Sequence, residues 1–144
     1  MTRSGSATWA DTPGVLALPC GALIRGRAAS DGAIPADFSL LLAAGPTPSW
    51  RWRRLNWPDF WVPRDPVDAI AGIREAHSRA EQGERVEVVC RGGIGRTGTA
   101  LAAMAVLDGV DPDQAVAWVR AGYHPRAVET PWQRRWLRRL ASSR

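Results

Sequence analysis

Residues 85–107, RVEVVCRGGIGRTGTALAAMAVL, join a short β-like run to an apolar helix through a segment with glycine at positions 92, 93, 95 and 98. A strand that leads into a helix in this way is typical of α/β domains, in which helices pack on a central sheet. The turn lies at the positive end of the helix, where backbone N–H groups can bind an anion. Because Cys90 and Arg96 bracket the turn, this segment predicts both a fold class and a site.

The rest of the chain predicts further strands before this segment and further helices around it. The expected strands are 14–18, 22–27, 37–43, 50–57 and 85–89, and the expected helices are 67–82, 97–109, 111–123 and 130–140. Asp111 and Thr130 each precede a proline and predict N-caps, and Gly83 predicts a C-cap. We therefore expect one α/β domain over residues 1–144, with a central mixed sheet of about four or five strands flanked by helices and a flexible start at residues 1–13.

Two familiar interpretations of the glycine-rich turn fail on their context. The pattern Gly93-x-Gly95-x-x-Gly98 matches the dinucleotide-binding fingerprint, which needs a second strand that ends in an acidic residue about 20 positions on. Here Asp111-Pro112 and another helix follow instead. A nucleoside triphosphate loop needs Gly-Lys-Ser/Thr, and the chain contains no lysine.

A third interpretation uses the two residues that bracket the turn. The planar guanidinium of Arg96 can bind two phosphate oxygens at once. Cys90 lies in the field of the helix N-terminus, which favours the nucleophilic thiolate. We therefore expect a phosphate to bind over Cys90, the alternative being a buried structural cysteine beside a turn. The expected phosphate-binding residues are Arg91, Gly92, Gly93, Ile94, Gly95 and Arg96.

Composition argues against several other classes of function. The formal net charge is +5, but all 19 basic residues are arginine, which is typical of a coding bias, and we do not expect nucleic-acid binding. The two cysteines and two histidines are too scattered to suggest a zinc ligand set, so we expect no metal and no cofactor. No apolar stretch is long enough to cross a membrane and no signal segment is present, so we expect a cytoplasmic protein without membrane association.

The remaining cysteine and the two histidines are interpreted as structural. Cys20 lies in a predicted turn, and its alternative role is a resolving thiol for Cys90. A structural disulfide is not expected in a reducing compartment. His77 and His124 are assigned to packing rather than catalysis.

The segment from Cys90 to Thr97 resembles the Cys-x5-Arg-Ser/Thr signature of the protein tyrosine and dual-specificity phosphatases. WPDFWVP, at residues 57–63, resembles the mobile loop that carries the general acid in that superfamily, and its Asp59 lies 31 positions before Cys90. RAVETPWQRRW, at residues 126–136, resembles the segment that holds the water-orienting glutamines. The resemblance runs from about Trp50 to Trp136 and implies a small bacterial-type member with a dual-specificity-phosphatase-like fold. The residues of the acid loop are then Trp57, Pro58, Asp59 and Trp61.

The resemblance implies a role for each residue of the signature. Cys90 would attack phosphorus while Asp59 protonates the leaving oxygen, and Asp59 would then take a proton from the water that hydrolyses the phosphocysteine. Arg96 and the loop N–H groups would hold the equatorial oxygens. Thr97 would hydrogen-bond the sulfur, and Gln133 would position the water.

The chain departs from the family pattern at three positions. Val89 stands where the family usually has the histidine that orients the nucleophile, and Trp61 stands where the acid loop usually has glycine. Glu129 replaces the first water-orienting glutamine of the tyrosine-specific branch, while Gln133 matches the second. These departures bear on the rate rather than on the reaction type.

We expect a cysteine-dependent phosphomonoester hydrolase, specifically a tyrosine or dual-specificity protein phosphatase, that vanadate-like oxyanions inhibit. The alternative is a catalytically slow phosphate-binding adaptor, for which Val89 and Trp61 are the only support. A rhodanese-like sulfurtransferase has a different loop length and no role for Asp59. Arsenate reduction needs a relay of thiols, and Cys20 is the only second thiol.

Overall fold

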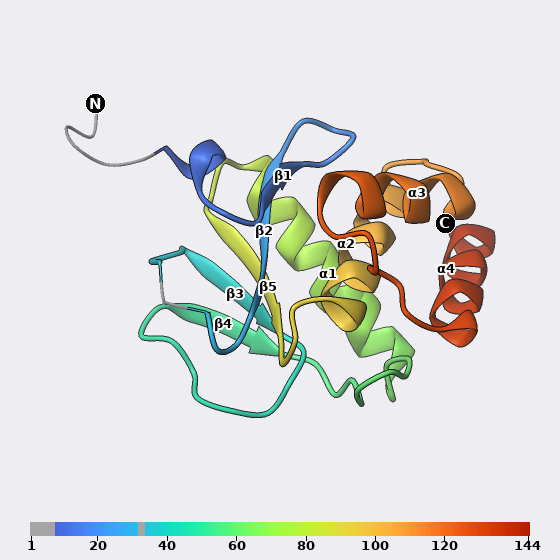
Figure 1. Cartoon of the computed structure of the whole chain (residues 1–144), viewed down its shortest axis with the longest axis horizontal. Coiled ribbons are helices and arrows are strands. Elements are labelled where there is room, and N and C mark those ends of the chain that lie inside the picture. The colour runs from blue at the N-terminus through green and yellow to red at the C-terminus, as the bar shows by residue number, and fades with distance from the viewer. Residues whose placement is uncertain (1–7, 32–33) are drawn as a thin grey trace.

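The computed structural model describes residues 8–31 and 34–144, which form a five-stranded mixed sheet with four α-helices (Figure 1). The strands are β1 (Val15–Ala17), β2 (Leu23–Ala28), β3 (Phe38–Leu41), β4 (Arg51–Arg54) and β5 (Val86–Cys90), in the order β1-β2-β5-β3-β4. β1 is antiparallel to β2, and the other neighbours are parallel. The mixed α/β sheet predicted from the sequence is confirmed, with β5 at its centre.

The helices are α1 (Pro66–Glu81), α2 (Gly95–Leu107), α3 (Pro112–Gly122) and α4 (Pro131–Ser143). α1 and α2 pack against the sheet, and α3 and α4 pack against α2 (Figure 1). α2 is buried over nearly its whole length, as a helix that is apolar on all sides requires. The two predicted N-caps are confirmed, because Asp111 accepts from Asp113 N and Thr130 accepts from Gln133 N, whereas the C-cap of α1 is Gln82 and Gly83 follows it with a φ of 88°. None of the helices in the described ranges is both long and apolar enough to span a membrane.

The ends of several elements differ from the sequence prediction. β4 ends at Arg54 rather than Trp57, because the chain there turns into a loop that the hydrogen bond from Arg64 N to Asn56 O closes. α2 begins at Gly95 rather than Thr97, since Gly98 N already donates to Ile94 O. Residues 1–7 of the expected flexible start lie outside the described residues, and Trp9–Asp11 form a short 3-10 helix, η1.

The face of the sheet away from the helices carries a buried charged cluster. Glu87, at the centre of β5, is paired in register with Arg25 on β2 and Ser39 on β3, and it is fully buried. Its carboxylate accepts hydrogen bonds from Arg25, Arg27 and Ser39. Burial alone would raise the pKa of Glu87, but the hydrogen bonds from Arg27, Ser39 and Arg25 outweigh it and leave this pKa below its ordinary value.

We predict that Glu87→Gln lowers the free energy of unfolding by about 3 kcal/mol, because it leaves the cation of Arg25 buried without its counter-charge. Glu84→Gln is the matched control. Glu84 pairs with Arg79 at the partly exposed surface, so its loss should change that free energy by less than about 1 kcal/mol. Urea unfolding at neutral pH measures the free energy of unfolding of each variant. Equal losses in Glu87→Gln and Glu84→Gln would contradict the prediction.

The Glu87 carboxylate also makes the stability of the fold depend on pH, in a direction that its lowered pKa sets. Because folding lowers the pKa of Glu87 from 4.5, its contribution to stability is complete above that value and is lost as the pH falls through the lower folded pKa. The stability difference between wild type and Glu87→Gln should therefore shrink on acidification below pH 4.5. A difference that grows on acidification would show that the carboxylate is protonated in the native protein.

Candidate active site

The turn between β5 and α2 wraps around the sulfur of Cys90. Cys90 is the last residue of β5, is 2% exposed, and accepts a hydrogen bond from Gly93 N at 3.1 Å. Gly93 has a φ of 68°, and a Cβ there would lie 2.5 Å from the backbone nitrogen of Ala28. Only glycine fits this position, because the left-handed backbone and the close approach of β2 both exclude a side chain. The loop geometry is thus fixed by β2 as well as by β5.

The first turn of α2 presents polar groups that the protein leaves unpaired. Ile94 is the N-cap and makes no side-chain hydrogen bond to the helix. In the described part of the chain, Arg96 Nε and Thr97 Oγ1 are buried without a hydrogen-bond partner. Buried polar atoms are nearly always paired, so unpaired ones at a helix N-terminus favour a binding site for an anion.

Arg96 connects this turn to two other segments. Its Nη1 donates to Leu42 O at 3.0 Å, just beyond β3, and to Trp57 O at 2.9 Å, in the loop after β4. Its Nε lies 3.5 Å from Asp59 Oδ1, which is an ion-pair distance without hydrogen-bond geometry. The structure therefore brings Cys90, Arg96 and Asp59 to one end of the sheet, beyond the carboxyl ends of its parallel strands.

The segment with Asp59 is a tight, internally bonded loop. Trp57 is buried, packs edge-on against Trp136 with ring centroids 5.4 Å apart, and donates from Nε1 to Trp61 O. Phe60 has a φ of 59°, and its N–H donates to Asp59 Oδ1 at 3.0 Å. The Asp59 side chain is 51% exposed. The buried Trp57 thus anchors a loop whose carboxylate faces both Arg96 and solvent.

The beginning of α4 holds this loop from the other side. Gln133 is fully buried; its Oε1 accepts from Glu129 N and Thr130 N, and its Nε2 donates to Trp61 O at 3.1 Å. Trp132 donates from Nε1 to Phe60 O, and its ring packs against Trp61 at 5.2 Å. No local sequence pattern predicts these contacts, because the partners lie 72 positions apart.

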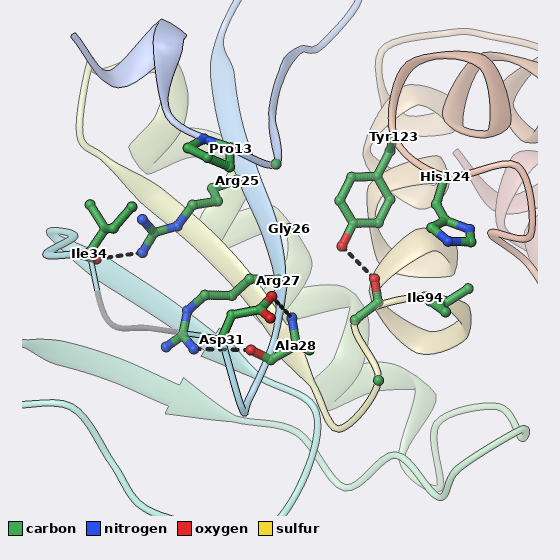
Figure 2. Close-up of a pocket in the computed structure, with 13 residues that line it drawn as sticks. Pro13, Arg25, Gly26, Arg27, Ala28, Asp31, Ile34, Ile94, Tyr123 and His124 are labelled. Carbon is green, nitrogen blue, oxygen red and sulfur yellow. Dashed lines mark hydrogen bonds between the residues drawn. The ribbon is translucent and has the colours of Figure 1, made fainter. Parts of the chain in front are cut away.

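Tyr123, the C-cap of α3, supports the turn between β5 and α2 (Figure 2). Its hydroxyl donates to Gly93 O. Burial raises the pKa of Tyr123, and the negative charges of Cys90 and Asp31 raise it further, so the hydroxyl remains a donor at neutral pH. Together with β2, Tyr123 and His124 line a cavity of about 780 Å³ that flanks the loop at Gly92, Gly93 and Ile94. Cys90 is not among its lining residues.

Some residues predicted for the site lie elsewhere or bind otherwise. Thr97 does not form the expected hydrogen bond to Cys90, whose sulfur is bonded to Gly93 N instead. Gln133 is engaged in the helix cap and the acid loop, so its role toward water stays a prediction. Arg91 is exposed beside the turn. Both cysteines are free, and Cys20 lies at the other end of the sheet, which places it too far away to act as a resolving thiol in this conformation.

Comparisons with known proteins point to one superfamily. The sequence model of the family described as protein-tyrosine phosphatase matches residues 47–127. The structure of Tk-PTP in its active form aligns with a TM-score of 0.69 at 24% identity, over 83% of this chain and 90% of that chain. The structure of PTPMT1 in complex with PI(5)P aligns with a TM-score of 0.65 at 16% identity, over 75% of this chain and 78% of that chain. The structure of PTPN18 in complex with HER2-pY1196 phosphopeptides aligns with a TM-score of 0.65 at 17% identity, over 90% of this chain and 69% of that chain.

We predict that Gln133→Glu loosens the Asp59 loop without removing the helix cap. A glutamate at this position can still accept from Thr130 N, but it cannot donate to Trp61 O and repels that carbonyl. Hydrogen exchange of residues 58–64 should accelerate by roughly 10-fold, which corresponds to one lost hydrogen bond of about 1.4 kcal/mol. Arg135→Gln, at an exposed position of the same helix, is the control and should leave this exchange unchanged. Equal exchange in both variants would show that Gln133 does not hold the loop.

Proposed function

This chain belongs to the protein-tyrosine phosphatase family, and we propose that it hydrolyses phosphomonoesters through a covalent phosphocysteine formed on Cys90. Family membership makes it a protein-tyrosine-phosphatase-like phosphatase, a hydrolase of phosphomonoesters. The observation that carries the mechanism is the convergence of Cys90, Arg96 and Asp59 around a turn with unpaired buried donors.

In the first step, the Cys90 thiolate attacks phosphorus on the side opposite the ester oxygen. The S–P bond forms as the P–O bond breaks, and Asp59 transfers its proton to the leaving oxygen. The hydrogen bond from Gly93 N to Cys90 Sγ supports this role, since it stabilises negative charge on the sulfur. The exposed side of Asp59 leaves room for the leaving group.

In the second step, water attacks phosphorus and gives a proton to the Asp59 carboxylate. The S–P bond breaks, inorganic phosphate leaves and the thiolate is regenerated. Arg96 stabilises the equatorial oxygens in both steps, because its guanidinium is already held by Leu42 O and Trp57 O and needs no reorganisation. The backbone N–H groups at the start of α2 act on the same oxygens.

We propose a phosphorylated protein as the substrate and vanadate-like oxyanions as inhibitors. An exposed aromatic patch lies beside Asp59. It consists of Phe60, Trp61 and Trp132, which are 54%, 51% and 40% exposed. Such a patch favours contact with a peptide around the phosphorylated residue over a small phosphate ester. Solved structures of this fold hold both a phosphoinositide and phosphopeptides, so the fold alone does not select between them.

The mechanism predicts a specific pattern of phosphate release from a phosphotyrosine peptide, measured with a chelator present. Cys90→Ser should abolish turnover, because the hydroxyl is not ionised at neutral pH. Asp59→Asn should lower kcat by about 100-fold or more, since it removes the proton donor. Asp113→Asn, at an exposed aspartate that pairs with Arg138, should leave kcat unchanged.

Turnover that survives in Cys90→Ser would contradict the thiol mechanism. A wild-type protein that binds vanadate but releases no phosphate from either phosphotyrosine or phosphothreonine peptides would support the alternative of a catalytically slow phosphate-binding adaptor. Parallel assays with phosphothreonine peptides then separate tyrosine specificity from dual specificity.

A further inference from the structure

A second cluster of chemically reactive side chains lies at the end of the sheet opposite the phosphate loop. Cys20 belongs to the turn between β1 and β2, His77 to the last turns of α1, and Asp108 is the C-cap of α2. One donor atom from each lies within 4.8 Å of the other two. The distance from Cys20 Sγ to His77 Nε2 is 3.9 Å, and that from His77 Nε2 to Asp108 Oδ1 is 2.7 Å.

The imidazole of His77 has a carboxylate at each nitrogen. Glu81 Oε1 lies 3.0 Å from Nδ1, and Asp108 Oδ1 lies opposite Nε2. A neutral imidazole has a single N–H, so only one of these contacts can be a hydrogen bond unless a proton or a metal cation lies between Nε2 and Asp108. A histidine whose Nδ1–H donates to a carboxylate while Nε2 faces other ligands is the arrangement found in protein metal sites.

The cluster is held by the fold rather than by flexible side chains alone. Asp108 Oδ2 accepts from Cys20 N at 3.3 Å, which leaves Oδ1 directed toward His77. The backbone of Asp108 is fixed to Met104 O, and the Cys20 turn is closed by the hydrogen bond from Leu18 N to Ala22 O. The side chains of His77 and Asp108 are 12% and 11% exposed, whereas Cys20 is exposed and gives access from solvent.

We propose that Cys20, His77 and Asp108 form a zinc-binding site with a fourth coordination position open to water. A thiolate, an imidazole and a carboxylate are the three ligand types that zinc accepts, and the thiolate disfavours magnesium and calcium. Tetrahedral zinc places its ligand atoms roughly 3.3–3.6 Å apart. Zinc coordination therefore requires Cys20 Sγ to lie slightly closer to His77 Nε2, and Asp108 Oδ1 slightly farther from it, than in this structure.

Zinc at this position would fasten the β1–β2 turn to the C-terminal ends of α1 and α2. From the sequence we expected no metal, because the ligands are separated by 57 and 31 positions and form no local motif. The site lies at the other end of β5 from Cys90, so its role is independent of the proposed phosphatase chemistry.

The test uses the full chain with Cys90→Ser as the parent, because the second thiol could itself bind zinc. Zinc is titrated in competition with a chromophoric chelator, and cobalt is used as a spectroscopic probe. The parent should bind one equivalent of zinc, and its cobalt complex should show a thiolate-to-cobalt charge-transfer band. Cys20→Ser and His77→Gln should each weaken zinc binding by at least about 100-fold, and Cys20→Ser, which removes the thiolate, should abolish that band.

Glu81→Gln should weaken zinc binding by about 10-fold through His77, whereas Glu84→Gln, a nearby glutamate outside the cluster, should not change it. Zinc should also raise the thermal unfolding midpoint of the parent but not that of Cys20→Ser. A parent without the cobalt band, or zinc affinity unchanged in both Cys20→Ser and His77→Gln, would overturn the proposal. Because Cys20 is exposed in a turn, its replacement does not threaten the fold.

Discussion

The buried guanidinium of Arg96 is the interaction on which the arrangement of the site depends. It is only 5% exposed, and a charged group at that depth is stable only when its donors are paired. Nη1 meets part of this requirement with Leu42 O and Trp57 O, which belong to the segments after β3 and β4, and the Nε–H has no hydrogen-bond partner in the described part of the chain. The same side chain thereby fixes the phosphate loop relative to the loop of Asp59, and it leaves Nε beside that carboxylate.

The remaining supports converge on the same two loops from the helical layer. Tyr123 bonds Gly93 O from the end of α3, while Trp132 and Gln133 bond the carbonyls of Phe60 and Trp61 from the start of α4. A loop carbonyl is a poor anchor by itself, but several directed donors reduce the conformations that the loop can adopt. Helices α3 and α4, which do not belong to the strand–turn–helix segment, therefore hold the proposed catalytic groups in place.

The two ends of the sheet carry different chemistry because parallel strands align their termini. The carboxyl ends of β2, β5 and β3 collect the glycine-rich turn and Arg96, as in other α/β proteins. The opposite end collects the β1–β2 turn and the C-terminal ends of α1 and α2, where Cys20, His77 and Asp108 meet. Between them, the buried Glu87 cluster on the open face joins β2, β5 and β3.

The sequence by itself determined the elements, because strand alternation, helix periodicity and capping act within a few residues of one another. It also predicted Cys90, Arg96 and Asp59, since the first two belong to one turn and the third to a recognisable loop. The hydrogen bond expected from Thr97 to Cys90 is not formed in this structure, where Gly93 N donates to the sulfur, so the role of Thr97 in the reaction stays a prediction. Only the tertiary structure decided how Gln133, Trp132 and Tyr123 are used and that Cys20, His77 and Asp108 meet. These contacts join positions 30 to 88 residues apart, and no local pattern encodes them because packing of the helices on the sheet creates them.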